Sequence, residues 1–257
     1  MTAPAPILPF TESGAGDAPP FVLLHGFGSD ARGFARLQDD LAASRRVISF
    51  DLPGHGRALD WPRIGGAGVA ARAVAASLEA LELQRVHLVG HSMGGAAAAI
   101  MALKQPEQLA SLTLLAPGGF GPEINHKLLR RYAAARDAEA LEPLLEQFFG
   151  FSFSLPRLVI RQSAEARARP GVCETLVEIV ESLLDGPRQQ TLPLEEIAAL
   201  GLPVRVVWGR QDRVLPVSQT EGLPGAFALH LLEGVGHMPH LEAPGAVARI
   251  LREQAGS

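Results

Sequence analysis

Short apolar runs that alternate with helical patterns most limit what this chain can fold into. Six such runs are strand-like, and the first four each end in a loop rich in Gly, Pro or Asp: residues 21–24, 47–50, 86–89, 112–115, 204–208 and 228–232. Helical patterns accompany them at residues 34–43, 69–82, 94–104 and 243–254. Buried strands that alternate with helices form parallel sheets through crossover connections. The sequence therefore predicts an α/β fold with a mostly parallel sheet flanked by helices.

Residues 118–200 interrupt this alternation. They lack a strong strand pattern and look helical around residues 127–148, 157–168 and 173–185. The interruption is too long for a plain loop. We therefore predict that residues 1–117 and 201–257 form the core, that residues 118–200 form a helical cap inserted into it, and that residues 11–20 are a mobile arm.

Composition and charge exclude several classes of protein. Hydrophobic residues make up 47% of the 257 residues, which excludes a disordered chain. The net charge is −4, without the clustered positive stripe that nucleic-acid binding needs. The longest apolar stretch, residues 94–103, is about half the roughly 20 residues that span a bilayer, and the first residues do not resemble a secretory signal. The single cysteine, Cys173, excludes an internal disulfide and favours a reducing cytoplasm, so we expect a cytoplasmic protein with no membrane or nucleic-acid partner.

A candidate nucleophile, Ser92, follows the third apolar run. It lies in the pentapeptide Gly90-His91-Ser92-Met93-Gly94, between the predicted strand and a helix of small residues. A G-x-S-x-G motif in this position exposes a serine on a sharp, strained turn, where neighbouring Cβ atoms would collide. The start of the helix adds positive potential where an oxyanion would form.

A nucleophilic serine needs a base, and the base needs an orienting acid. In this architecture the three follow in the order serine, acid, histidine, with the acid and histidine in loops after strands. Asp212 follows the run at 204–208 and His237 follows the run at 228–232, so we predict the triad Ser92, Asp212 and His237. Asp185, in a helical-looking region, and Asp51, in a loop before the serine, are weaker candidates.

The loop after the first strand is a candidate oxyanion hole. It contains the glycine-flanked turn His25-Gly26-Phe27-Gly28. The expected donors are the backbone amides of Phe27 and Met93, the latter being the residue after the nucleophile.

The sequence suggests no metal or cofactor. His240 lies three residues after His237, but no third ligand pattern accompanies the pair. Four phenylalanines of the predicted cap either line a pocket or attach the cap to the core: Phe148, Phe149, Phe151 and Phe153. We expect the substrate pocket to include Phe27, Phe120, Phe148, Phe149 and Met238.

Together these motifs resemble the α/β-hydrolase fold over residues 21 to about 252. The stretch Leu114-Leu115-Ala116-Pro117-Gly118-Gly119-Phe120-Gly121-Pro122-Glu123-Ile124-Asn125 is similar to the hydrolase-like C-terminal domain of acetoin dehydrogenase acetyltransferase components, as is the tail at 232–238. The first twenty residues look too short for the hairpin that usually opens this fold, so we expect fewer than eight strands in the main sheet.

The sequence also departs from that group. The acetyltransferase components carry a lipoyl domain ahead of the hydrolase-like part, and we expect this chain to lack one, since its residues leave no room for it. None of its histidines is followed by Asp at the fourth position, as the H-x-x-x-D motif of lipoamide acyltransferases requires.

A weaker resemblance is to meta-cleavage-product hydrolases, which split carbon–carbon bonds with the same triad. That resemblance implies an arginine in the cap and a tryptophan after the catalytic histidine. Here Met238 follows His237, and Arg157 and Arg161 are candidates for the cap arginine.

These observations favour a serine hydrolase that cleaves an ester or thioester of a small to medium acyl group, without a cofactor. Three alternatives stay open: a carbon–carbon bond hydrolase, an acyltransferase with an acceptor other than water, and an accessory module that docks on a dehydrogenase complex.

Overall fold

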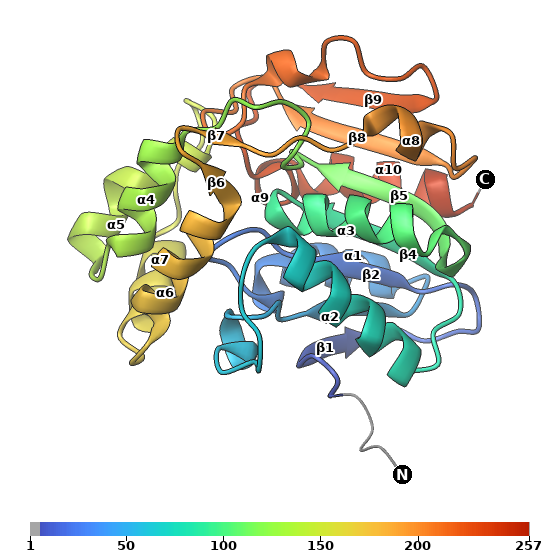
Figure 1. Cartoon of the computed structure of the whole chain (residues 1–257), viewed down its shortest axis with the longest axis horizontal. Helices are drawn as coiled ribbons and strands as arrows, with labels where there is room; N and C mark the ends of the chain where they lie inside the picture. Colours follow the sequence, from blue (N-terminus) through green and yellow to red (C-terminus); the bar gives the residue numbers. More distant parts are fainter. Residues whose placement is uncertain (1–5, 257) are drawn as a thin grey trace.

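The centre of the molecule is a seven-stranded sheet in the order β1-β3-β2-β4-β5-β8-β9 (Figure 1). The structure is a computed structural model that describes residues 6–256. Neighbouring strands pair in parallel except β1, which is antiparallel to β3. The strands are β1 (Phe10–Ser13), β2 (Phe21–Leu24), β3 (Val47–Phe50), β4 (Val86–His91), β5 (Leu109–Leu115), β8 (Val204–Gly209) and β9 (Phe227–Leu232).

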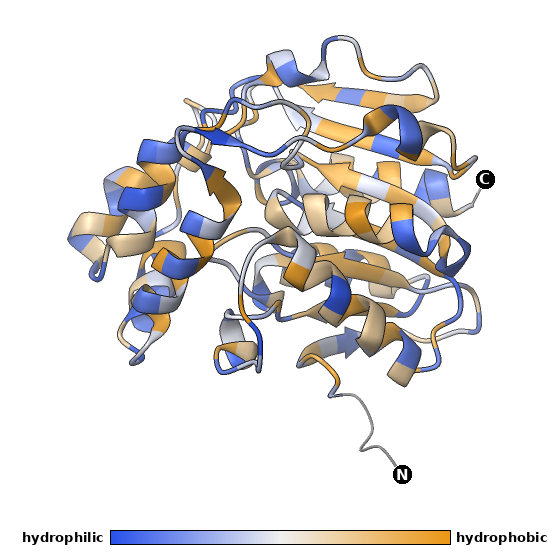
Figure 2. Ribbon diagram, viewed as in Figure 1, coloured by the Kyte–Doolittle hydropathy of each residue, from blue (hydrophilic) through white to orange (hydrophobic). Residues whose placement is uncertain are grey.

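Helices cover both faces of the sheet because inner strand residues alternate between two apolar layers. Val22, Leu24 and Leu88 pack with α2 and α3, whereas Leu23 and Val89 pack with α1 and α10. Figure 2 shows apolar residues concentrated along the strands. The helices of the two layers are α1 (Ala35–Ala42), α2 (Ala67–Ala80), α3 (Met93–Lys104), α8 (Leu194–Ala198), α9 (Pro239–Glu242) and α10 (Pro244–Ala255).

The predicted α/β fold is confirmed, and the sheet has fewer than eight strands within residues 6–256, as expected. The predicted mobile arm is wrong in part, because residues 10–13 form β1. Thr11 donates from Oγ1 to Gln38 at 3.0 Å, and Glu12 pairs with Arg46 at 2.6 Å. These contacts, with the ladder to β3, hold the segment at the edge of the sheet.

Residues 118–200, named here the helical segment, lie between β5 and β8 and are mainly helical. In Figure 1 their helices α4–α7 form a group beside one end of the sheet. The elements are α4 (His126–Ala134), α5 (Ala138–Leu145), the 3-10 helix η4 (Glu146–Phe148), α6 (Arg157–Arg167), α7 (Val172–Leu183), the short strands β6 (Leu184–Asp185) and β7 (Arg188–Gln189), and α8.

Most predicted helices agree with the structure to within two residues, but two in the helical segment have a different extent. The pattern at 127–148 is two helices because Asp137 caps α5, accepting a hydrogen bond from the Ala140 amide at 2.9 Å. The helix expected at 173–185 ends at Leu183, because Asp185 pairs with Arg188 in a small hairpin. No helix in residues 6–256 is long and apolar enough to cross a membrane.

Candidate active site

The turn between β4 and α3 holds Ser92 in a strained conformation, with φ 53° and ψ −115°. A side chain at Gly90 would collide with the carbonyl oxygen of Gly94, and one at Gly94 would collide with that of Leu24. Both glycines are therefore required for the turn to form against the neighbouring strand. The structure thus exposes the Ser92 side chain at the carboxyl end of the sheet, where it lines a cavity.

His237 and Asp212 lie together, although 25 residues separate them in the sequence. The Nδ1 atom of His237 donates to Oδ2 of Asp212 at 2.8 Å, and both side chains are almost completely buried. Oδ1 of Asp212 accepts from the amides of Val214 and Leu215 at 2.8 and 2.9 Å. This arrangement fixes the tautomer, so that Nε2 of His237 is the basic nitrogen.

The backbone of His237 is held from both sides. Its amide donates to the carbonyl oxygen of Phe148 at 2.7 Å. Its carbonyl oxygen accepts from Nε2 of His91 at 2.7 Å. The carboxylate of Glu242 accepts from the amides of Gly236 and Met238, at 3.0 and 3.1 Å. The loop that carries the imidazole is therefore tied to the helical segment, to β4 and to α9.

The backbone amides of Phe27 and Met93 are the predicted donors of an oxyanion hole. Met93 is the first residue of α3, and within residues 6–256 neither amide donates a hydrogen bond. Asp51 stabilises the Phe27 loop: its Oδ1 atom accepts from the Ala31 amide at 2.8 Å, and Oδ2 pairs with Arg57 at 2.7 Å. Asp51 thus supports the rim of the site.

Four buried histidines surround the site and stay neutral. Burial lowers the pKa of His55 to about 3, and charge repulsion from the neighbouring His25 adds to this shift. Burial likewise lowers the pKa of His240 to about 3, with repulsion from His237 adding to it. Burial also lowers the pKa of His25, and it places the pKa of His91 well below its ordinary value. These rings therefore serve as fixed hydrogen-bonding or packing groups over the neutral pH range.

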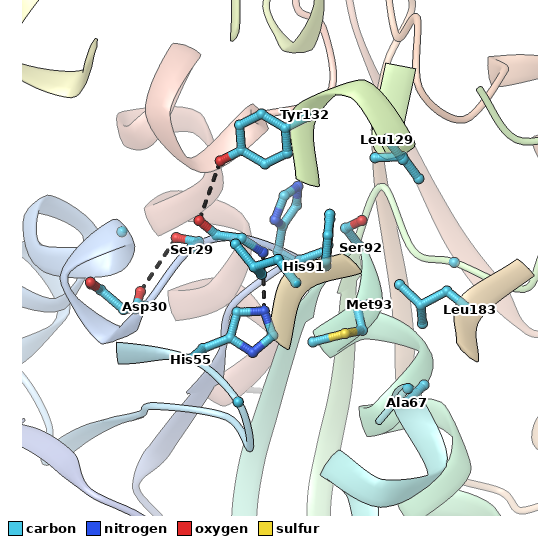
Figure 3. Close-up of a pocket in the computed structure, with 18 of the residues that line it drawn as sticks. Ser29, Asp30, His55, Ala67, His91, Ser92, Met93, Leu129, Tyr132 and Leu183 are labelled. Carbon is cyan, nitrogen blue, oxygen red and sulfur yellow. Dashed lines mark hydrogen bonds between the residues drawn. The ribbon is translucent and has the colours of Figure 1, made fainter. Parts of the chain in front are cut away.

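A cavity of about 1080 Å³ reaches from Ser92 and His237 to the helical segment (Figure 3). Of the predicted pocket residues, four line it: Phe27, Phe148, Phe149 and Met238. Phe120 does not, so that prediction is wrong. Its ring packs in the core, with its centroid 5.9 Å from that of Trp208 and 6.5 Å from that of Phe227.

The two candidate cap arginines also lie outside the cavity. Arg157 and Arg161 are on α6 but do not line it, and Arg161 pairs on the surface with Glu165. Arg167, at the end of the same helix, does line it. Asp185 is exposed in β6 and does not line the cavity. Within residues 6–256 no group of three metal-ligating side chains gathers.

Sequence reasoning missed several residues that support the site, among them Tyr132, His55 and Glu242. Tyr132 is the only tyrosine in the chain, which is the one signal that marks it. His55 and Glu242 are identified only by the structure, through their hydrogen bonds with backbone amides far away in the sequence.

The family model described as "Alpha/beta hydrolase family" matches residues 21–250. The chain belongs to this family. Its sheet order, the serine turn and the helical segment are consistent with that membership. The remaining comparisons indicate which members of the α/β hydrolase family this chain resembles.

The chain is 36% identical over 92% of its length to the dihydrolipoyllysine-residue acetyltransferase component of the acetoin cleaving system of Pseudomonas putida, and covers 63% of that relative. It is 30% identical over 92% of its length to the 2-hydroxy-6-oxo-6-phenylhexa-2,4-dienoate hydrolase of Comamonas testosteroni, covering 86% of it. The solved structure of the hydrolase of the same name from Rhodococcus sp. strain RHA1 superposes with a TM-score of 0.84, at 24% identity, over 99% of this chain and 97% of that one. This α/β hydrolase therefore spans less than two thirds of its acetoin-system relative.

Proposed function

We propose that this α/β hydrolase is a serine hydrolase that cleaves an ester or thioester of a small to medium acyl group through an acyl-enzyme. The observation that carries the proposal is the hydrogen bond between His237 and Asp212 at 2.8 Å, beside a cavity that Ser92 also lines. The helical segment acts as a cap over this cavity.

In the first step Oγ of Ser92 attacks the carbonyl carbon of the substrate, and Nε2 of His237 takes the hydroxyl proton. The C=O electron pair moves to the oxygen, and the amides of Phe27 and Met93 stabilise that oxyanion, each by about 3 kcal/mol. Collapse of the intermediate breaks the bond to the alcohol or thiol. The leaving group then receives the proton from His237 and departs. The acyl group stays on Ser92 as an ester.

In the second step a water molecule attacks the acyl-enzyme, and His237 takes its proton. The same two amides stabilise the second oxyanion. When the ester bond to Ser92 breaks, His237 returns the proton to Oγ, and a carboxylic acid leaves. Asp212 stays ionised throughout and stabilises the imidazolium form of His237.

The residue after the proposed base favours ester or thioester cleavage over carbon–carbon cleavage, because Met238 stands where the resemblance to ring-fission hydrolases implies tryptophan. The cap arginine that this resemblance also implies does not separate the two reactions: Arg157 and Arg161 do not line the cavity, but Arg167 does. Acyl transfer and an accessory role rest on the acetoin-system relatives, of which this chain covers less than two thirds.

Labelling with a fluorophosphonate tests the proposal. Ser92 of the wild type should displace fluoride and retain the phosphonyl group, located by mass spectrometry. The Ser92→Ala variant should not label, whereas Ser163→Ala, a change at another serine that lines the cavity, should label like the wild type. The wild type should also hydrolyse p-nitrophenyl butyrate faster than a ring-fission product. Absence of labelling in the folded wild type would contradict the proposal and favour an accessory module.

A further inference from the structure

The peptide groups on either side of Gly28 are held by side chains from two different parts of the chain. The Gly28 amide donates to Nε2 of His55 at 3.1 Å, and its carbonyl oxygen accepts from the hydroxyl of Tyr132 at 3.3 Å. Figure 3 shows Tyr132 and His55 on opposite sides of this loop. Tyr132 lies on α4, so one of the two contacts comes from the helical segment. Gly28 directly follows Phe27, whose amide is the proposed oxyanion donor.

The fit between Gly28 and Tyr132 is tight. Gly28 has a φ of 74°, and a Cβ atom there would lie 2.5 Å from Cε1 of the Tyr132 ring. The position therefore requires glycine both for its backbone angle and for its contact with the ring. A glycine peptide without a side-chain anchor is conformationally free, so it needs external contacts to keep one orientation.

Tyr132 is itself fixed. The guanidinium of Arg167 lies over its ring, with Cζ 4.6 Å from the centroid. Nη1 of Arg167 also donates to the carbonyl oxygens of Tyr132 and Ala133, each at 3.0 Å. The Tyr132 ring packs against the Phe148 ring, with centroids 5.0 Å apart. The carbonyl oxygen of Phe148 in turn accepts the hydrogen bond from the His237 amide. Tyr132 is 5% exposed, so its hydroxyl has little freedom to rotate away.

We infer that Tyr132 is a positioning residue for the oxyanion hole: its hydroxyl, supplied by the helical segment, orients the Gly28 peptide and through it the Phe27 amide. The inference rests on the proposed function of Ser92 and Phe27. It assigns the helical segment a part in stabilising the transition state, in addition to enclosing the substrate. Donors act fully only when they are held in place before the charge develops.

The test compares Tyr132→Phe, which removes only the hydroxyl, with Arg130→Gln. Arg130 lies on the same helix and pairs with Glu181 on the surface, without contact to Gly28. Loss of one neutral hydrogen bond predicts a fall in kcat of about three- to tenfold for Tyr132→Phe on p-nitrophenyl butyrate, with KM unchanged. The affinity for a trifluoromethyl ketone, which adds to the serine and places an oxyanion in the hole, should fall by the same factor.

Hydrogen exchange gives a readout that does not depend on activity. The amides of Gly28 and Ser29 donate to His55 and to the Gly26 carbonyl, so they are protected in the wild type. In Tyr132→Phe they should exchange faster by a similar factor, while Arg130→Gln exchanges like the wild type.

The outcomes separate the two proposals. Unchanged kcat, ketone affinity and exchange in Tyr132→Phe would overturn the positioning role, even with an active wild type. A wild type that neither labels nor hydrolyses esters would overturn the proposed function. In that case the exchange of Gly28 and Ser29 would still decide whether Tyr132 orders the loop. A rise in KM with unchanged kcat would assign Tyr132 to substrate binding and also overturn the inference.

Discussion

The imidazole of His91 donates from Nε2 to the carbonyl oxygen of His237 at 2.7 Å, so the residue before the candidate nucleophile holds the backbone of the candidate base. Their ring centroids are 4.9 Å apart. Strand β4 and the histidine loop, far apart in the sequence, are thereby locked together at the point where proton transfer is proposed.

Replacement of His91 by phenylalanine should disturb this lock. The variant keeps a ring but leaves the buried His237 carbonyl without its donor, which costs about 1–3 kcal/mol. We expect kcat for p-nitrophenyl butyrate to fall about tenfold or more. His87→Phe, on the same strand but bonded to Ser111, is the matched control and should keep the wild-type kcat. Equal kcat values for the two variants would show that His91 does not position His237.

Replacement of Asp212 by asparagine should reduce kcat by about 10⁴, because an amide at this position favours the wrong tautomer of His237. Asp185→Asn, in the exposed hairpin, should leave kcat unchanged. The kcat of each purified variant on p-nitrophenyl butyrate measures both effects. The acid is wrongly assigned if Asp185→Asn is the inactive variant.

Replacement of Glu242 by glutamine should lower stability. The carboxylate accepts from the amides of Gly150, Gly236 and Met238, at 2.7, 3.0 and 3.1 Å, and an amide side chain cannot accept with both ends. We expect a loss of about 2 kcal/mol, or a fall in Tm of about 4–8 °C by scanning calorimetry. Glu233→Gln, which removes a surface ion pair with Arg210, should change stability by less than about 1 kcal/mol. A Tm of Glu242→Gln within a degree of the control would contradict this account.

Acid should destabilise the fold through its buried histidines. His55 and His240 have a pKa of about 3 in the folded chain, against 6.5 for an unperturbed imidazole. Below pH 6.5 the unfolded chain binds protons that the folded chain does not, so stability is full above about pH 7 and falls as the pH drops towards 3.

Urea unfolding at several pH values measures this dependence. The slope of the unfolding free energy against pH should correspond to about two or more protons between pH 6 and 4. In His240→Phe, which keeps the aromatic contact with Phe34, the slope should be smaller by about one proton. A wild type equally stable at pH 4.5 and 7.5 would show that these rings are accessible when folded.

The local sequence pattern was sufficient to predict the inner strands of the sheet and the turn that carries Ser92. The inner strands are short continuous apolar runs. The glycines at positions 90 and 94 are visible in the sequence, and the structure shows that a Cβ atom at either position would collide with a backbone carbonyl oxygen. Asp212 and His237 were predicted from chain order and from their positions after strands. Their hydrogen bond agrees with that prediction, and their catalytic roles stay a proposal.

The rest depends on contacts that the sequence does not display. Strand β1 contains the polar residues Thr11 and Glu12, and only pairing with β3 makes it a strand. Phe120 was predicted to line the pocket, but its ring packs beside that of Trp208. The contact between Gly28 and Tyr132 joins residues 104 positions apart, so no local pattern can show it.

The helical segment leaves the sheet after β5 and returns to it at β8, and these two strands are adjacent in the sheet. Its length can therefore change by insertion or deletion without shifting the register of any strand, and Ser92, Asp212 and His237 all lie outside it. Recombination among relatives could exchange the segment and with it the substrate range, leaving the reacting groups in place. A grafted segment would have to supply three contacts to the rest of the site: the proposed hydroxyl contact of Tyr132 with Gly28, the Phe148 carbonyl that accepts from the His237 amide, and the Gly150 amide that donates to Glu242.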